Sequence, residues 1–144
     1  MTENVGVEYG SAVVVTEDRY LLVNTHVLMY QSIEKTVLFD NIYIRFSDKE
    51  DYQQVYLIKV DENLDLALLR LINNKEKVRT CKIGYESKLN YGDVIYAIGN
   101  INNSGISITK AVVSLPYVNI QYGDSVKQVI QCDVIISEGS SGVL

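Results

Sequence analysis

The sequence predicts an all-β fold, a barrel or sandwich built from short antiparallel strands. Apolar residues recur at every second position in a series of short stretches rich in Val, Ile, Leu and Tyr. Charged or turn-forming residues separate these stretches, as at Glu17-Asp18, Ser47-Asp48 and Asn73-Asn74. The chain has 144 residues, of which 47% are hydrophobic, so it can bury a core as one domain or as two small subdomains sharing an interface.

The predicted strands follow one another closely along the chain. They are Ser11–Thr16, Tyr20–Asn24, Val37–Phe46, Gln53–Val60, Leu66–Leu71, Asp93–Ile98, Ser107–Leu115, Ser125–Gln131 and Val134–Ile136. The best helical candidate is His26–Lys35, with one or two turns at most. The polar segment Asn73–Val78 is the expected link between two halves.

Composition excludes several classes of protein. The 18 acidic and 13 basic residues give a net charge of −5, and the basic residues are scattered, so a nucleic-acid partner is not expected. Charged residues interrupt apolar runs such as Tyr20–Val23 well short of the ~20 residues that a membrane span requires. Met1–Asn4 has no secretory signal pattern, so the compartment cannot be read from this chain. Cys81 and Cys132 are too few for a zinc set, and we interpret both as free thiols in core-like surroundings.

Ser141 is the candidate nucleophile. It lies in Ser137–Leu144, where flanking glycines allow a tight backbone that exposes the hydroxyl and turns backbone N–H groups toward one point. The same composition is ordinary for a turn or linker. A catalytic interpretation therefore requires a base and an acid elsewhere in the chain.

His26 and Asp65 are the candidates for those two roles. His26 is the only histidine and lies where an apolar strand gives way to a turn, although a lone histidine there is more often a core or surface residue. Asp65 ends an acidic turn and precedes an apolar strand. Such a residue commonly only starts the strand, but its carboxylate at the rim of a core could hold an imidazole by one nitrogen.

In their order along the chain, these segments resemble the trypsin/chymotrypsin-like serine peptidases, and among them the bacterial HtrA (Deg) type. The matching motifs span most of the chain, from Gly10 to Gly142. The family's Gly-Ser-Gly strand is matched by Gly10–Val15, and its "Thr-Asn-x-His-Val" segment by Tyr20–Val27. The segment "Asp-x-x-x-Asp-Leu-Ala-Val-Leu" is matched by Asp61–Leu71, and "Gly-Asp-x-x-x-Ala-Ile-Gly-Asn" by Gly92–Asn100. The strand "Val-Thr-x-Gly-Ile-Val-Ser" is matched by Ile108–Leu115, and "Ile-Gln-Thr-Asp-Ala-Ala-Ile-Asn-x-Gly-Asn-Ser-Gly" by Ile130–Gly142.

The resemblance implies a fold of two antiparallel β-barrels of the six-stranded type. Residues 1–75 would form the first barrel, with His26 and Asp65, and residues 76–144 the second, with Ser141. Members of the family continue beyond the serine, so we expect the second barrel to be incomplete in this chain. The chain is then either a fragment of a longer protein or a reduced form.

The resemblance also implies a serine endopeptidase acting through an acyl-enzyme, with His26 as general base, Asp65 as its orienting acid and Ser141 as nucleophile. The backbone of Gly139, Ser140 and Ser141 would form the oxyanion hole. No metal or organic cofactor is required. The expected partners are polypeptides, in particular unfolded segments; an oligomer is compatible with the resemblance, and the family tends to be extracytoplasmic.

The specificity pocket is expected at Ile135 and Ile136, with Ser137 and Glu138 toward its rim. These branched apolar walls favour a small aliphatic residue before the cleaved bond. The chain departs from the family pattern at Ser140, which replaces an Asn, and at Val143, which replaces a Gly. The alternative is therefore a catalytically impaired barrel that serves as a binding or scaffolding module, whereas the presence of all three catalytic residue types favours the enzyme.

Overall fold

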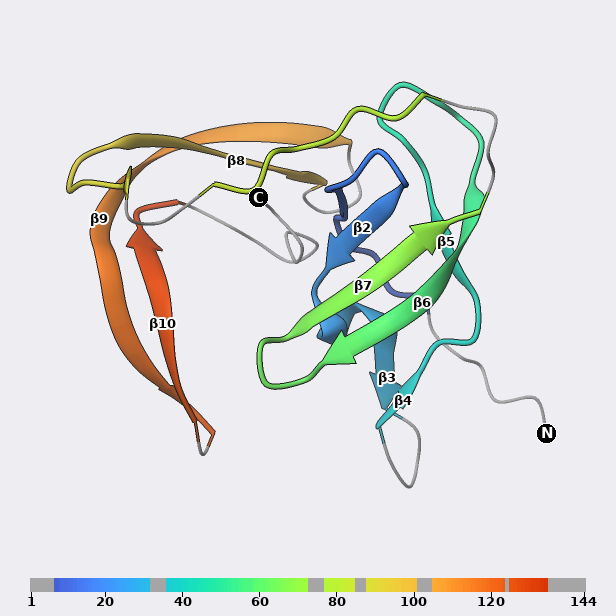
Figure 1. Cartoon of the computed structure of the whole chain (residues 1–144), viewed down its shortest axis with the longest axis horizontal. Helices are drawn as coiled ribbons and strands as arrows, with labels where there is room; N and C mark the ends of the chain where they lie inside the picture. The colour runs from blue at the N-terminus through green and yellow to red at the C-terminus, as the bar shows by residue number, and fades with distance from the viewer. Residues whose placement is uncertain are drawn as a thin grey trace.

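The computed structural model describes residues 7–31, 36–72, 77–84, 88–100, 105–123 and 125–134. These residues form two antiparallel β-sheet halves that lie side by side (Figure 1). A one-turn 3-10 helix, η1 (Thr25–Leu28), follows β2 (Tyr20–Val23). The prediction of an all-β fold is confirmed.

Within the described residues, the first half contains a five-stranded sheet in the order β1-β2-β7-β6-β5. Strand β7 (Leu66–Leu71) pairs on one side with β2 (Tyr20–Val23) and on the other with β6 (Gln53–Asp61). Strand β1 (Val13–Val14) lies outside β2, and β5 (Ile42–Ile44) lies outside β6. Alternate residues of β2 and β7 are buried, as the period of two in the sequence predicts.

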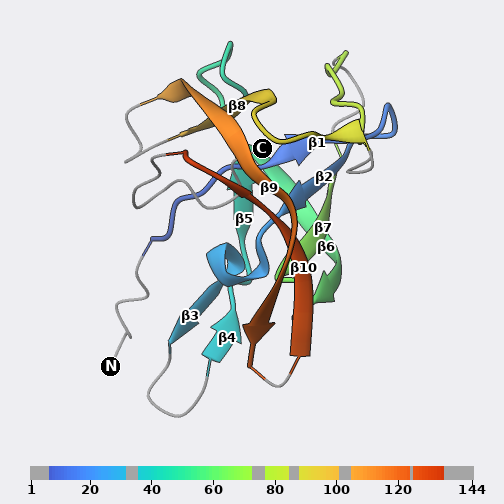
Figure 2. The ribbon, with the colours of Figure 1, turned by 90° about the vertical axis from the view of Figure 1, so that its left-hand side faces the viewer.

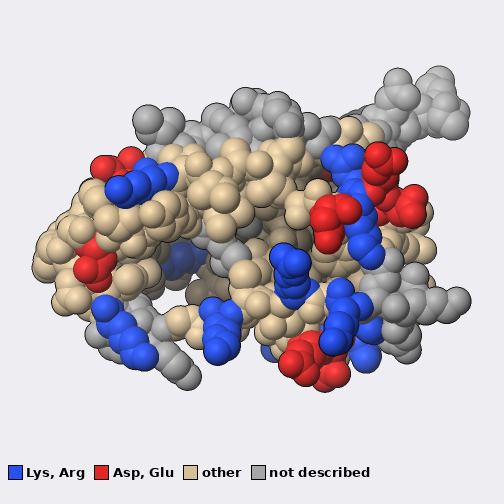
Figure 3. Space-filling view, turned by 90° about the horizontal axis from the view of Figure 1, so that it is seen from above, with Lys and Arg blue, Asp and Glu red and all other residues tan. Residues whose placement is uncertain are grey.

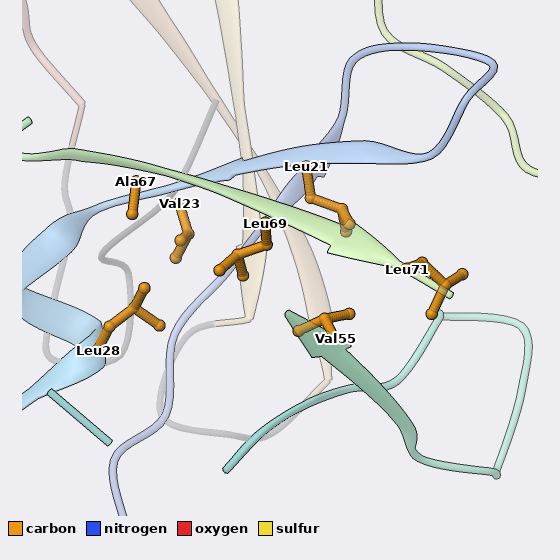
Figure 4. Packing of buried hydrophobic residues seen from close by; sticks show 7 residues of the cluster. All are labelled: Leu21, Val23, Leu28, Val55, Ala67, Leu69 and Leu71. Carbon is orange, nitrogen blue, oxygen red and sulfur yellow. The ribbon is translucent and has the colours of Figure 1, made fainter. Parts of the chain in front are cut away.

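The inward-facing side chains of this sheet, together with Leu28 of η1, form an apolar core (Figure 4). At its centre, Leu69 of β7 is 1% exposed and pairs with Leu21 of β2 and Leu57 of β6. A fully buried leucine contributes about 1.5–3 kcal/mol relative to an exposed one. The buried members of the cluster are Leu21, Val23, Leu28, Val55, Ala67, Leu69 and Leu71.

The helix expected at His26–Lys35 is wrong at Met29–Gln31, and residues 32–35 lie outside the described residues. Residues Met29–Gln31 instead form β3, which pairs with β4 (Thr36–Leu38) in a separate two-stranded sheet. The ring of Tyr30 contacts that of Phe39 at a centroid distance of 5.0 Å, so tertiary packing overrides the local pattern. The expected strand Val37–Phe46 is likewise divided between β4 and β5.

The second half contains a curled antiparallel sheet in the order β10-β9-β8, in which β9 bends strongly (Figures 1 and 2). Strand β8 spans Val94–Asn100, β9 spans Ile106–Tyr122 and β10 spans Ser125–Cys132. Strand β9 is longer than the sequence predicts, because the chain continues through Pro116. The pairing of β9 with β10 changes register beside that proline, which has no N–H to give to the ladder.

Among the described residues, hydrogen bonds from two backbone N–H groups connect the halves. The Asn100 N–H at the end of β8 donates to Ser11 Oγ at 2.9 Å, and Ser11 is buried. The Cys81 N–H donates to the Val14 carbonyl at 2.8 Å. The start of the first half therefore contacts both the segment that precedes β8 and the last residue of β8.

Both cysteines are free thiols, as the sequence suggests, but the expected core-like surroundings are wrong for Cys81, which is exposed. Cys132 is half-buried at the end of β10. Basic and acidic side chains both occur over the face shown in Figure 3. Across the described ranges, no helix combines the length and apolar character needed to cross a membrane.

Candidate active site

Asp65 lies at the end of the turn that joins β6 to β7, in an unusual backbone conformation. The Leu64 N–H donates to Asp61 Oδ1 at 3.0 Å, and the Asp65 N–H donates to the Glu62 carbonyl at 3.3 Å. Asp65 has φ of 53°, and among the described non-glycine residues only Arg19 also has positive φ. Aspartate tolerates this left-handed region better than most side chains, because its short polar group can form local hydrogen bonds.

The start of η1 docks onto Asp65. The Thr25 N–H donates to the Asp65 carbonyl at 3.1 Å, and the His26 N–H donates to Asp65 Oδ1 at 2.9 Å. The first N–H groups of a helix have no partner within the helix, so Asp65 satisfies two of them. The same contacts fix the backbone of His26 relative to the β6–β7 turn.

The His26 ring contacts the same carboxylate. Nδ1 of His26 lies 2.7 Å from Asp65 Oδ2, a distance typical of a charge-assisted hydrogen bond. Because an ionised carboxylate can only accept, Nδ1 carries the proton and neutral His26 presents Nε2 as a proton acceptor. The His26 side chain is 56% exposed and that of Asp65 is 23% exposed, so the carboxylate is more sheltered than the imidazole.

Asn24 belongs to the site, although the sequence analysis did not single it out. Its Nδ2 donates to the Asp65 carbonyl at 3.0 Å and to Asp65 Oδ2 at 3.2 Å. The "Thr-Asn-x-His-Val" segment contains an asparagine at this position and could have marked it. The direction of its amide depends on the β6–β7 turn, which lies far away in the sequence.

These contacts control the pKa of Asp65. Burial by itself raises the pKa, because the charged form loses hydration. Hydrogen bonds from the backbone and ring of His26, the charge of the imidazolium and the hydrogen bond from Asn24 together outweigh burial and hold the pKa below its ordinary value. The carboxylate is therefore ionised at neutral pH.

The other predicted site residues lie outside the described residues. These are the nucleophile and oxyanion-hole residues Gly139, Ser140 and Ser141, and the pocket residues Ile135, Ile136, Ser137 and Glu138. The chain is described as far as Val134. Just before that point, the Asp133 N–H donates to the Val112 carbonyl at 3.2 Å, and the Val112 N–H donates to Asp133 Oδ1 at 2.7 Å.

A cavity of about 320 Å³ lies on the inner side of the first sheet, lined by residues that include Val23, Leu28 and Leu69. Neither His26 nor Asp65 lines it, so it is separate from the imidazole–carboxylate pair. Across the described part of the chain, no three His, Cys, Asp or Glu side chains are grouped so that they could hold a metal ion.

An imidazole oriented by a sheltered carboxylate can take up and return a proton, the role of such a pair in nucleophilic hydrolases. The all-β fold and this pair therefore define a class of β-sheet proteins with an acid–base site. Comparisons with known proteins agree with this class. The sequence model of the family described as "Trypsin-like peptidase domain" matches residues 10–142.

Curated relatives and solved structures narrow the assignment. Proteins described as "Probable periplasmic serine endoprotease DegP-like" are 32% identical over 133 residues in Pseudomonas putida and 31% identical over 136 residues in Bartonella henselae. These alignments cover 92% and 94% of this chain and 25% of each relative. The structure titled "HtrA-type protease AlgW with tripeptide" superposes with a TM-score of 0.77 at 29% identity, over 93% of this chain and 41% of that one. The complex of AlgW with a decapeptide gives 0.74 at 27% identity, over 93% and 38%.

The chain belongs to the trypsin-like peptidase domain family, and within it to the HtrA type. The resemblance seen in the ordered sequence motifs is confirmed, as is the all-β, trypsin-like fold class, with an incomplete second barrel among the described residues. The chain spans about a quarter of the length of the curated relatives that it matches.

Proposed function

We propose that this chain is part of a serine endopeptidase that hydrolyses peptide bonds through His26, Asp65 and Ser141. The observation that carries the proposal is the 2.7 Å contact between His26 Nδ1 and Asp65 Oδ2, which leaves Nε2 as the basic nitrogen. Membership of a family whose curated relatives are described as serine endoproteases supports it. We further propose that residues 1–75 and 76–144 correspond to the two barrels.

In the proposed mechanism, His26 Nε2 takes the proton from Ser141 Oγ as the oxygen attacks the carbonyl carbon of the substrate. The imidazolium then gives this proton to the leaving nitrogen as the C–N bond breaks, which leaves an acyl-enzyme. Water hydrolyses the ester by the same steps in reverse order. Asp65 remains ionised and stabilises the imidazolium, while backbone N–H groups in Gly139–Ser141 bind the oxyanion.

The proposed substrates are polypeptides, in particular unfolded segments. The solved neighbours whose titles name a bound tripeptide or decapeptide support this class of ligand. Ile135 and Ile136, with Ser137 and Glu138 at the rim, would favour a small aliphatic residue before the cleaved bond, because an apolar pocket has no carboxylate to pair with a basic side chain. We also propose an extracytoplasmic location, since the curated relatives are described as periplasmic.

A fluorophosphonate probe followed by peptide mapping tests the proposal directly. We expect one covalent adduct on Ser141, strongly reduced in His26→Ala and absent in Ser141→Ala. Circular dichroism would verify that each variant is folded. A folded wild-type protein that stays unlabelled, while a known serine peptidase in the same solution reacts fully, would overturn the proposal in favour of a binding module.

A further inference from the structure

Asn24 occupies the N-cap position of η1 but does not cap it. Asparagine is among the best N-cap residues, because its side-chain oxygen can accept a hydrogen bond from an N–H of the first turn. Asn24 has the extended backbone of an N-cap residue, with φ −70° and ψ 139°, yet its side chain makes no capping hydrogen bond. Stabilisation of the helix therefore does not explain why the Asn24 side chain points where it does.

The Asn24 amide instead contacts two oxygens of a single residue. Nδ2 lies 3.0 Å from the Asp65 backbone carbonyl and 3.2 Å from Asp65 Oδ2. A donor shared between the main chain and the side chain of one residue restricts rotation of that side chain about its own backbone. Oδ1 is held separately by the His26 N–H at 2.9 Å, so each carboxylate oxygen has a donor besides the imidazole.

The orientation of the carboxylate determines which nitrogen of His26 carries the proton. An Asp65 carboxylate turned away from Nδ1 would no longer select the tautomer with the proton on Nδ1. The left-handed backbone conformation of Asp65 is itself strained, and the contacts around Asp65 offset that strain. Asn24 and the N–H groups of Thr25 and His26 are the donors that hold Asp65 from the side of η1.

We propose that Asn24 is a positioning residue, whose amide fixes the rotation of the Asp65 carboxylate and thereby sets the tautomer and orientation of His26. The catalytic consequence rests on the proposed function, whereas the effect on His26 can be measured without any activity. Asn24 itself would touch neither the substrate nor the nucleophile in this scheme. Its influence would pass through Asp65.

Nitrogen NMR on the folded protein tests the structural part. Because His26 is the only histidine, its two ring nitrogens give an unambiguous signal. We expect the wild type to show a protonated Nδ1 with a low-field proton. Asn24→Ala and the isosteric Asn24→Asp, which replaces the donor with a second carboxylate, should both give a mixture of tautomers and lose that proton signal. Asn63→Ala, an exposed change in the same β6–β7 turn, should leave the spectrum unchanged.

A measurement on the wild type covers the case in which the variants do not fold. The Asn24 side-chain amide protons should be distinct from each other and protected from exchange with water. Freely exchanging amide protons, or folded Asn24 variants that keep the wild-type tautomer, would overturn the proposal.

Kinetics separate this inference from the proposed function. We expect Asn24→Ala to lower kcat roughly 10- to 100-fold with little change in KM, by analogy with residues that orient metal-binding histidines. An inactive wild type would refute the proposed function but leave the NMR result standing. An active wild type whose Asn24→Ala variant has an unchanged kcat would refute the positioning role alone.

Discussion

Asp65 accepts hydrogen bonds from both the backbone and the ring of His26, at 2.9 Å to Oδ1 and 2.7 Å to Oδ2. The two donors belong to one residue and the two acceptors to one carboxylate, so the imidazole cannot turn about its own backbone without breaking a contact. This relationship connects the start of η1 to the β6–β7 turn across 39 positions of sequence. It also leads to predictions about activity and about stability.

Asp65→Asn tests the orientation of the imidazole. The side chain keeps its shape, but an amide that donates toward Nδ1 would stabilise the tautomer with the proton on Nε2. We expect kcat to fall by about 10⁴, as the equivalent change does in a Ser-His-Asp peptidase. Peptide hydrolysis and probe labelling would measure the loss. A variant that retained a tenth of the wild-type kcat would contradict the role of Asp65.

The stability of the protein should depend on pH through Asp65. The pKa of Asp65 is lower in the folded state than that of an unperturbed aspartate, so the folded state favours the ionised form. The resulting stabilisation is fully present above the unfolded pKa and is lost as the pH falls through the folded pKa. We expect the free energy of unfolding to decrease below about pH 4, and to decrease less in Asp65→Asn. Urea titrations at several pH values would measure both slopes, and parallel curves would contradict the prediction.

Much of the fold could be predicted from the sequence, because strand periodicity follows directly from burial of one face. Alternate burial along β2 and β7 is the property that the apolar pattern encodes. The error at Met29–Gln31 has a different origin. Those residues become a strand because β4 lies beside them, which is a contact that the local pattern does not contain.

The candidate active site was likewise predictable only in part from the sequence. His26 and Asp65 could be proposed from their motifs, since each lies at the end of a strand in a recognisable segment. The role of Asn24 could not, because it depends on a left-handed residue 41 positions away whose backbone carbonyl and carboxylate both face the amide. Sequence identifies residue types, whereas the direction of a donor depends on how two distant turns meet.

Thr25→Val should make the protein more stable. Thr25 is 2% exposed, and its hydroxyl has no hydrogen-bond partner among the described residues. Valine has nearly the same shape and removes the cost of burying that oxygen, so we expect a gain of up to about 1 kcal/mol. The Thr25 N–H, which donates to the Asp65 carbonyl, is unaffected, and activity should be retained.

Thr16→Val is the matched control for this stability measurement. Thr16 Oγ1 accepts the Tyr20 N–H at 3.1 Å, so the same change removes a hydrogen bond there. We expect Thr16→Val to destabilise the protein by at most about 1.5 kcal/mol, because the site is exposed. Thermal unfolding of both variants would show opposite shifts, and a loss of stability in Thr25→Val would indicate that its hydroxyl has a partner.

Asp133 should determine the stability of the junction between β9 and the segment that leads to Ser141. Its carboxylate accepts the Val112 N–H at 2.7 Å, while its own N–H donates to the Val112 carbonyl at 3.2 Å. Asp133→Ala leaves the Val112 N–H without this acceptor, whereas Asp133→Asn keeps an oxygen at the same place. We expect hydrogen exchange at the Val112 amide to accelerate roughly tenfold in the alanine variant, equivalent to about 1.4 kcal/mol, and to change little in the asparagine variant. Labelling of Ser141 should slow only where exchange accelerates. Equal exchange rates in the two variants would show that the carboxylate oxygen does not secure this junction.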